Sequence, residues 1–93
     1  MLLEEVKLRM LPILVRHDVI RAAIFGSFAR GESKENSDLD ILVELPKTKS
    51  LLNLAALKLE LEDELKRDVD ILTYRGLHPR IREKVIKEQL AIL

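Results

Sequence analysis

The sequence of 93 residues has no cysteine and no tryptophan, and aromatic residues make up only 3% of it. The lack of cysteine excludes disulfide bonds, cysteine-ligated zinc and thiol catalysis, and it fits a cytoplasmic protein. No apolar run approaches the ~20 residues that a membrane-spanning helix needs, so we expect no membrane association. Glu4 and Glu5 interrupt the first residues, which therefore do not resemble a secretory signal.

The chain also lacks an excess of either charge, because 16 Lys and Arg balance 16 Asp and Glu. A protein that binds nucleic acid mainly through its phosphates needs a basic excess, so strong direct nucleic-acid binding is not expected. A local basic patch remains compatible with this balance. Hydrophobic residues make up 47% of the sequence, which indicates a folded protein, and the length predicts a single domain over residues 1–93.

Hydrophobic periodicity and turn residues predict helices that alternate with strands. The expected helices cover residues 2–16, 27–31, 50–67 and 79–91, and the expected strands cover residues 19–25, 38–45 and 68–73. Pro12 should kink the first helix or mark a boundary near it. Residues 32–37 are expected to form a polar loop and residues 74–78 a turn. This order predicts an α/β (α+β) protein with a small sheet covered by helices on at least one face.

Two aspartates lead into an apolar run in the stretch DLDILVEL. Residues i and i+2 of a strand point to one face, so Asp38 and Asp40 project together while Leu39 faces the core. Ile41 and Val43 continue the core-facing series. Carboxylates roughly 6–7 Å apart repel each other, and a divalent cation such as Mg²⁺ or Mn²⁺ removes that penalty. A lone Asp-x-Asp is more often a solvated turn, so this pattern needs support from other residues.

Gly26 and Ser27 end the first predicted strand and begin the short helical stretch after it. Glycine permits a tight turn and a close backbone approach, and the N–H groups that follow can point at a phosphate. The Ser27 hydroxyl adds a further donor. The alternative is that Gly26 merely ends the strand and Ser27 caps the helix.

A second acidic pair opens the predicted strand DVDILT, where Asp68 and Asp70 alternate with apolar residues. If this strand lies beside the first pair, a third carboxylate completes a site for two metal ions. One ion would hold nucleotide phosphates and the other would activate the attacking oxygen. The alternative is an Asp-x-Asp at a strand end exposed to water.

Taken together, these features form a specific set: Gly-Ser, residues 28–37, Asp-x-Asp on a strand, and an aspartate on the next strand. This set resembles the nucleotidyltransferase superfamily typified by DNA polymerase β. GSFARGE followed by SDLDILVE is similar to its smallest members, the minimal nucleotidyltransferases (MNT domains). The resemblance covers nearly the whole chain and implies one MNT domain, with a small mixed sheet covered by helices.

The resemblance assigns roles to individual residues. Gly26 and Ser27 match the nucleotide-binding turn that holds the phosphates. Asp38 and Asp40 match the metal-binding pair. Asp70 matches the third catalytic carboxylate, which also binds metal and in active members helps to deprotonate the incoming hydroxyl.

Arg30 matches an arginine common in this motif, where it would contact phosphate or hold the loop, and a structural salt bridge is an equal alternative. Gly31 is expected to adopt a positive φ. Asp70 is preferred to Asp68 because it lies deeper in the strand, although both would point to one face.

Three further side chains have two interpretations each. His17 and His78 lie near predicted helix ends, so a surface or capping role is favoured for both over a catalytic one. Tyr74 could stack on a nucleotide base or cover the sheet edge, and we favour the covering role.

The resemblance also implies a function. MNT proteins are typically paired with HEPN-domain proteins, which are small helical ribonuclease toxins, and the MNT member is the antitoxin. Members with an intact site transfer AMP from ATP to a tyrosine of the toxin. We therefore expect ATP as substrate, two Mg²⁺ ions (or Mn²⁺) as cofactors and a HEPN toxin as partner, in a homo- or hetero-oligomer.

Two alternatives to this function stay open. The chain could neutralise its partner by docking alone, with catalysis weak or irrelevant. It could instead adenylylate a small molecule, although no acceptor-binding domain fits into 93 residues.

Overall fold

A computed structural model describes residues 2–31 and 38–93, and the polar loop predicted at 32–37 lies outside these described residues. The elements are α1 (Leu3–Arg16), β1 (Arg21–Phe25), α2 (Gly26–Ala29), β2 (Leu39–Glu44), α3 (Leu51–Leu65), β3 (Val69–Thr73), α4 (Pro79–Glu88) and β4 (Leu90–Ala91). All but β4 match the predicted elements closely. The last helix was wrongly expected to reach residue 91; it ends at Glu88, Gln89 is extended, and β4 follows.

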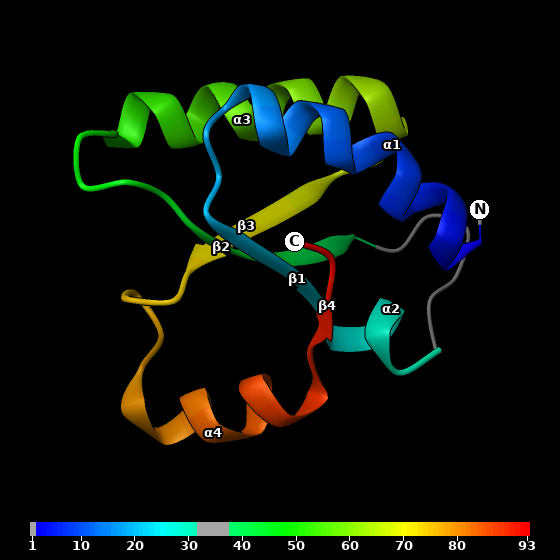
Figure 1. Ribbon diagram of the computed structural model, residues 1–93. Helices are drawn as coiled ribbons and strands as arrows, with labels where there is room; N and C mark the ends of the chain where they lie inside the picture. Colours follow the sequence, from blue (N-terminus) through cyan, green and yellow to red (C-terminus); the bar gives the residue numbers. More distant parts are fainter. Residues whose placement is uncertain (1, 32–37) are drawn as a thin grey trace.

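The four strands form one mixed sheet in the order β3-β2-β1-β4. β1 runs antiparallel to both β2 and β4, whereas β2 and β3 are parallel. α1 and α3 cover one face of the sheet, while α2 and α4 lie on the other side (Figure 1). The expected class, a small mixed sheet covered by helices, is therefore confirmed.

The main core lies between the sheet and the helices α1 and α3. Leu39, Ile41 and Val43 of β2 are fully buried there, as their alternation predicted. The helices contribute apolar residues at helical spacing: Val6, Met10, Ile13 and Leu14 from α1, and Leu57, Leu61 and Leu65 from α3. Apolar side chains that recur every second residue in the strand and about every 3.6 residues in the helices thus pack together in one layer.

A smaller cluster under α4 joins Leu42, Tyr74 and Leu77, with Val85 packed against it. The helix α4 makes few apolar contacts. Ile81 and Ile86 are 48% and 39% exposed, whereas Val85 packs against the cluster. The reason is that α4 rests on a small area of sheet and has no buried residue.

α1 continues through Pro12 for four further residues, so no helix boundary lies at the proline. Proline removes a backbone donor and crowds the preceding turn. Ile13 and Leu14 are buried directly after it, and this tertiary packing holds the helix together. In the parts of the chain that the structure describes, no helix combines the length and apolar content of a membrane span.

Both histidines occupy helix ends, in agreement with the sequence. The Nδ1 atom of His78, the N-cap of α4, accepts a hydrogen bond from the Arg80 N–H at 3.1 Å. His17 follows α1, and its Nε2 lies 2.8 Å from Oε1 of Glu60 on α3. Arg16 pairs with the other oxygen of Glu60. The hydrogen bond with His17, followed by that with Arg16, lowers the pKa of Glu60.

Glu60→Gln is expected to lower the midpoint of thermal unfolding at neutral pH, because the α1–α3 link loses its charge. The pKa of Glu60 is depressed in the folded protein, so its stabilising contribution is present above the ordinary pKa of 4.5. That contribution is lost as the pH falls through the lower folded-state pKa. The gap between wild type and variant should therefore close in acid, which melting by circular dichroism across a pH series measures.

Glu64→Gln is the matched control, since Glu64 is exposed on α3 and makes no ion pair within the described residues. The midpoint of thermal unfolding of this control should equal that of the wild type at every pH. A Glu60→Gln gap that persists unchanged in strongly acidic solution would contradict the role assigned to the carboxylate.

Candidate active site

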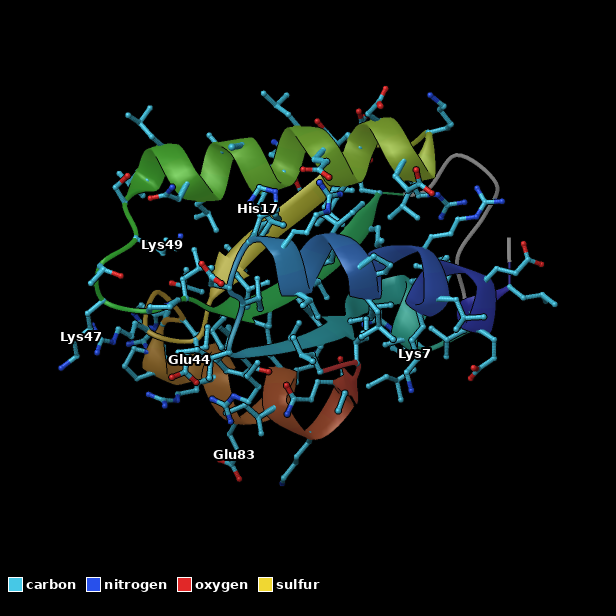
Figure 2. The ribbon with its side chains drawn as sticks, turned by 45° about the horizontal axis from the view of Figure 1, so that its top comes forward. Lys7, His17, Glu44, Lys47, Lys49 and Glu83 are labelled. Carbon is cyan, nitrogen blue, oxygen red and sulfur yellow. The ribbon has the colours of Figure 1, made fainter. Side chains whose placement is uncertain are left out.

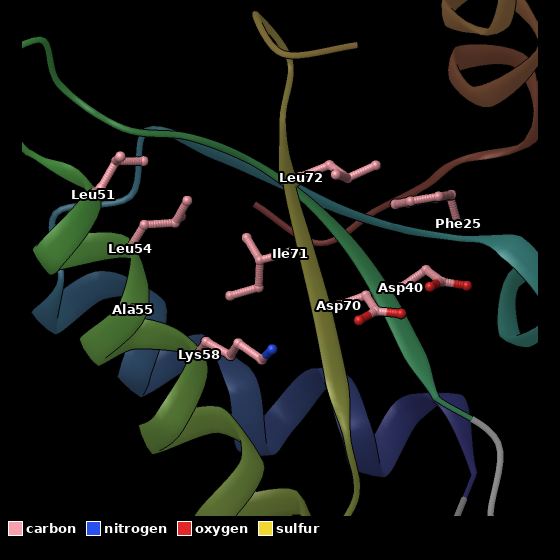
Figure 3. Close-up of a pocket in the computed structure, with 9 residues that line it drawn as sticks. All are labelled: Phe25, Asp40, Leu51, Leu54, Ala55, Lys58, Asp70, Ile71 and Leu72. Carbon is pink, nitrogen blue, oxygen red and sulfur yellow. The ribbon is translucent and has the colours of Figure 1, made fainter. Parts of the chain in front are cut away.

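Two aspartates from different parts of the sequence meet on the parallel strands. Asp40 of β2 lies opposite Asp70 of β3 in the sheet register. Their side chains project from the same side of the sheet, and the charge of Asp70 acts on the Asp40 carboxyl (Figure 3). The neighbouring residues Leu39 and Val69 are buried on the other face. Strand alternation thus separates the carboxylates from the main core.

The Asp40 carboxyl is in an unfavourable electrostatic position. Burial raises its pKa most, and the charges of Asp70 and then Asp38 raise it further. Arg30 acts in the opposite direction. Two like charges held in contact at a half-buried position destabilise the ionised pair, and a cation relieves this repulsion.

Asp38 and Asp68 lie just before their strands and are exposed. The charge of Asp38 acts on Asp40, but less than that of Asp70. The Asp68 carbonyl accepts a hydrogen bond from the Leu39 N–H at 3.0 Å. Over residues 2–31 and 38–93, no three Asp, Glu, His or Cys side chains gather closely enough to hold a metal ion. The structure therefore brings Asp40 and Asp70 together and leaves Asp38 beside the pair.

Gly26 lies directly against the Asp40 carboxylate. Its φ is +72°, in the left-handed region that favours glycine, and a Cβ placed on it would lie 2.2 Å from Asp40 Oδ2. A close backbone approach and a positive φ are both reasons for glycine here. The role predicted for the Ser27 hydroxyl concerns a side chain outside the described part of the structure. Gly31 has the expected positive φ, +74°.

Arg30, at the C-cap of α2, forms an ion pair with Glu88 of α4, with 3.3 Å between Nη1 and Oε2. Its charge also lowers the pKa of Asp40. The structural salt bridge considered from the sequence is therefore present.

A cavity of about 480 Å³ opens beside Asp40 and Asp70 (Figure 3). Its other lining residues are Phe25, Leu51, Leu54, Ala55, Lys58, Ile71 and Leu72. The sequence did not indicate Lys58, because a lysine among the leucines of α3 is typical of a solvated helix face. Only the tertiary placement of α3 against β3 brings its ammonium toward the site.

Tyr74 does not line this cavity. It is 5% exposed, its hydroxyl donates to Gln89 Oε1 at 3.0 Å, and the Arg21 guanidinium lies 3.8 Å from its ring centroid. The hydroxyl and one face of the ring of Tyr74 are therefore both in contact with other side chains. Tyr74 is therefore packed in the small cluster under α4, which favours a packing role over base stacking.

Comparison with known sequences gives a clear relationship. The family described as "Polymerase beta, Nucleotidyltransferase" matches residues 9–93. A Methanocaldococcus jannaschii protein named "Putative protein adenylyltransferase MJ0435" is 50% identical over 91 residues, 98% of each chain. "Protein adenylyltransferase MntA" of Thermococcus cleftensis is 40% identical over 73 residues, 78% of this chain and 74% of that protein.

Solved structures agree with the sequence matches. A "putative minimal nucleotidyltransferase" superposes with a TM-score of 0.84 at 45% identity, covering 97% of this chain and 95% of the other. The MNT antitoxin complex with a tri-AMPylated HEPN toxin from Shewanella oneidensis gives a TM-score of 0.75 at 18% identity, covering 97% and 71%. This second likeness shows the fold alone. On the strength of the sequence matches over nearly its whole length, the chain belongs to the polymerase β-type nucleotidyltransferase family and is a nucleotidyltransferase.

Proposed function

We propose that this protein transfers AMP from ATP to a tyrosine hydroxyl of a HEPN ribonuclease toxin and thereby neutralises it. The observation that carries the proposal is the position of Asp40, which lies opposite Asp70 in the sheet register and against the backbone of Gly26. Relatives named as protein adenylyltransferases support the donor chemistry. The complex of an MNT antitoxin with an AMPylated HEPN toxin supports the partner class.

The residues at the site fit a divalent cation. Mg²⁺ is typically held by one or two carboxylates together with substrate phosphates, so the Asp40–Asp70 pair with Asp38 beside it is sufficient. Mn²⁺ has the same oxygen preference. When bound, the metal would neutralise charge on the phosphates during transfer.

The chain's own groups then have distinct tasks. The backbone at Gly26 and Ser27 holds the phosphates, because only a residue without a Cβ lets the chain come this close to Asp40. Arg30 contributes positive charge beside them. Asp70, the more exposed carboxylate of the pair, receives the proton of the acceptor hydroxyl. The tyrosyl oxygen bonds to the α-phosphorus, the bond to the bridging oxygen breaks, and pyrophosphate leaves.

The test combines the purified protein with ATP labelled at the α-phosphate, Mg²⁺ and the HEPN protein encoded by the neighbouring gene. Mass spectrometry of the partner locates the modified residue. Label on a tyrosine, absent with the Asp38→Ala/Asp40→Ala variant, is the expected result. Label on another residue would refute the tyrosine target, and no label on the partner would refute the protein acceptor.

A second candidate is neutralisation by binding alone, and exposed apolar residues favour it. Leu8 and Val15 on α1 are 66% and 59% exposed and lie about two helical turns apart, on one face of the helix. Exposed apolar side chains that share one helix face commonly mark a docking site. A tight complex that silences the toxin without any label would establish this candidate in place of catalysis.

A further inference from the structure

A second cavity, of about 660 Å³, lies at the far ends of β2 and β3, away from the aspartates. It is bordered by the loop after β2, the turn after β3 and one residue of α4. Figure 2 shows Glu44, Lys47 and Lys49 together at this end of the molecule. The charged residues that line it are Arg21, Lys47, Lys49, Arg75, Arg82 and a single acid, Glu44. This excess of positive charge is notable in a chain whose net charge is zero.

Three of these cations are available to a ligand. Arg21 pairs with Glu44 at 3.5 Å, and Lys49 pairs with Asp18 at 3.1 Å. Within the described residues, Lys47, Arg75 and Arg82 have no ion-pair partner, and all three are exposed. Positively charged side chains that converge on one cavity from a loop, a turn and a helix create a local potential that attracts anions.

The two cavities adjoin, because Leu51 and Leu54 of α3 line both of them. A path therefore leads from the carboxylate pair, over apolar side chains, to the three cations. It follows β3, which is an edge strand of the sheet. The three residue steps along the strand from Asp70 to Thr73 span roughly 10 Å. A path of this shape suits an extended ligand.

We propose that the basic cavity binds an acidic, extended segment of the acceptor protein, a few residues from the hydroxyl that receives the nucleotide. The proposal rests on the proposed function, since it places the acceptor at Asp70. Peptide suits this path better than nucleic acid does. Leu51 and Leu54 offer aliphatic contacts in its middle, and Tyr74, the aromatic residue of the basic cavity, is buried and offers no face for base stacking.

The kinetic test reverses the three charges together, as Lys47→Glu/Arg75→Glu/Arg82→Glu. We expect the KM for the acceptor protein to rise about tenfold or more, with the KM for ATP unchanged, because only acceptor contacts are lost. Lys84→Glu is the control, since Lys84 is exposed on α4 and does not line the cavity. Equal effects of the triple variant and this control, or none from either, would overturn the proposal.

A binding test separates this proposal from the proposed function. Fluorescein-labelled hexaglutamate, followed by anisotropy, should bind the wild type and Lys84→Glu but not the triple variant, whether or not AMP is transferred. Absence of binding to the wild type would overturn the proposal. So would tighter binding of a single-stranded oligouridylate that the same substitutions abolish, which would assign the cavity to nucleic acid. Single reversals replace the triple variant if circular dichroism shows it unfolded.

Discussion

Replacing Asp40 by asparagine is expected to reduce the rate of AMP transfer by about 10²- to 10³-fold, the usual cost of losing one group that stabilises transition-state charge. Asparagine keeps the size of the side chain but removes the charge that would hold a cation beside the phosphates. Asp70→Asn should have a similar effect on kcat, because we propose that this carboxylate takes the acceptor proton. Initial rates with labelled ATP, at saturating partner, measure both.

Asp40→Asn should leave the folded protein at least as stable as the wild type. Asp40 and Asp70 are neighbouring carboxylates on adjacent strands, and without a cation their repulsion destabilises the ionised form of the half-buried Asp40. Asp40→Asn removes the repulsion, so its thermal unfolding midpoint, measured with a chelator, should not fall. Loss of activity with retained stability distinguishes a functional residue from a structural one.

Asp63→Asn is the matched control, because it makes the same chemical change at an exposed ion pair with Lys66 on the surface of α3. Exposed pairs contribute little, so activity and stability should both stay at wild-type values. If Asp40→Asn transferred AMP at the wild-type rate, the assignment of Asp40 to the active site would be wrong.

Gly26→Ala is expected to lose both stability and activity. A positive φ costs alanine about 1–2 kcal/mol in the free energy of unfolding. The new Cβ would also lie 2.2 Å from Asp40 Oδ2, so the carboxylate must move. A displacement of this kind in a catalytic site costs about 10²-fold in rate. Chemical denaturation and initial-rate measurements report the two effects separately.

Gly31→Ala provides a close control for this prediction. Gly31 has nearly the same φ, +74°, but a Cβ there would meet no atom of the described residues within 4 Å. Both variants should therefore lose stability through the positive φ, with a further loss in Gly26→Ala from the clash with Asp40, while only Gly26→Ala loses activity. Equal activity of the two would show that the contact between residue 26 and Asp40 does not matter for catalysis.

Much of the fold was predictable because its signals are local. Alternation in β2 placed Leu39, Ile41 and Val43 in the core, and helical spacing identified α3 from its buried leucines. β4 was missed because a strand of two residues carries no periodicity; Leu90 and Ala91 become a strand only by pairing with β1. The exposure of Ile81 and Ile86 likewise depends on how little of α4 the sheet covers.

For the site, the sequence by itself determined which residues we propose to carry the chemistry: Gly26 before a short helix, and aspartates at alternate positions of two strands. The sequence could identify them because each pattern consists of residues that lie close together along the chain. Only the tertiary structure decided that the parallel register puts Asp40 against Asp70, and that Gly26 touches the same carboxylate. The position of Lys58, the burial of Tyr74 and the basic cavity were also decided there, because each depends on how distant segments pack together.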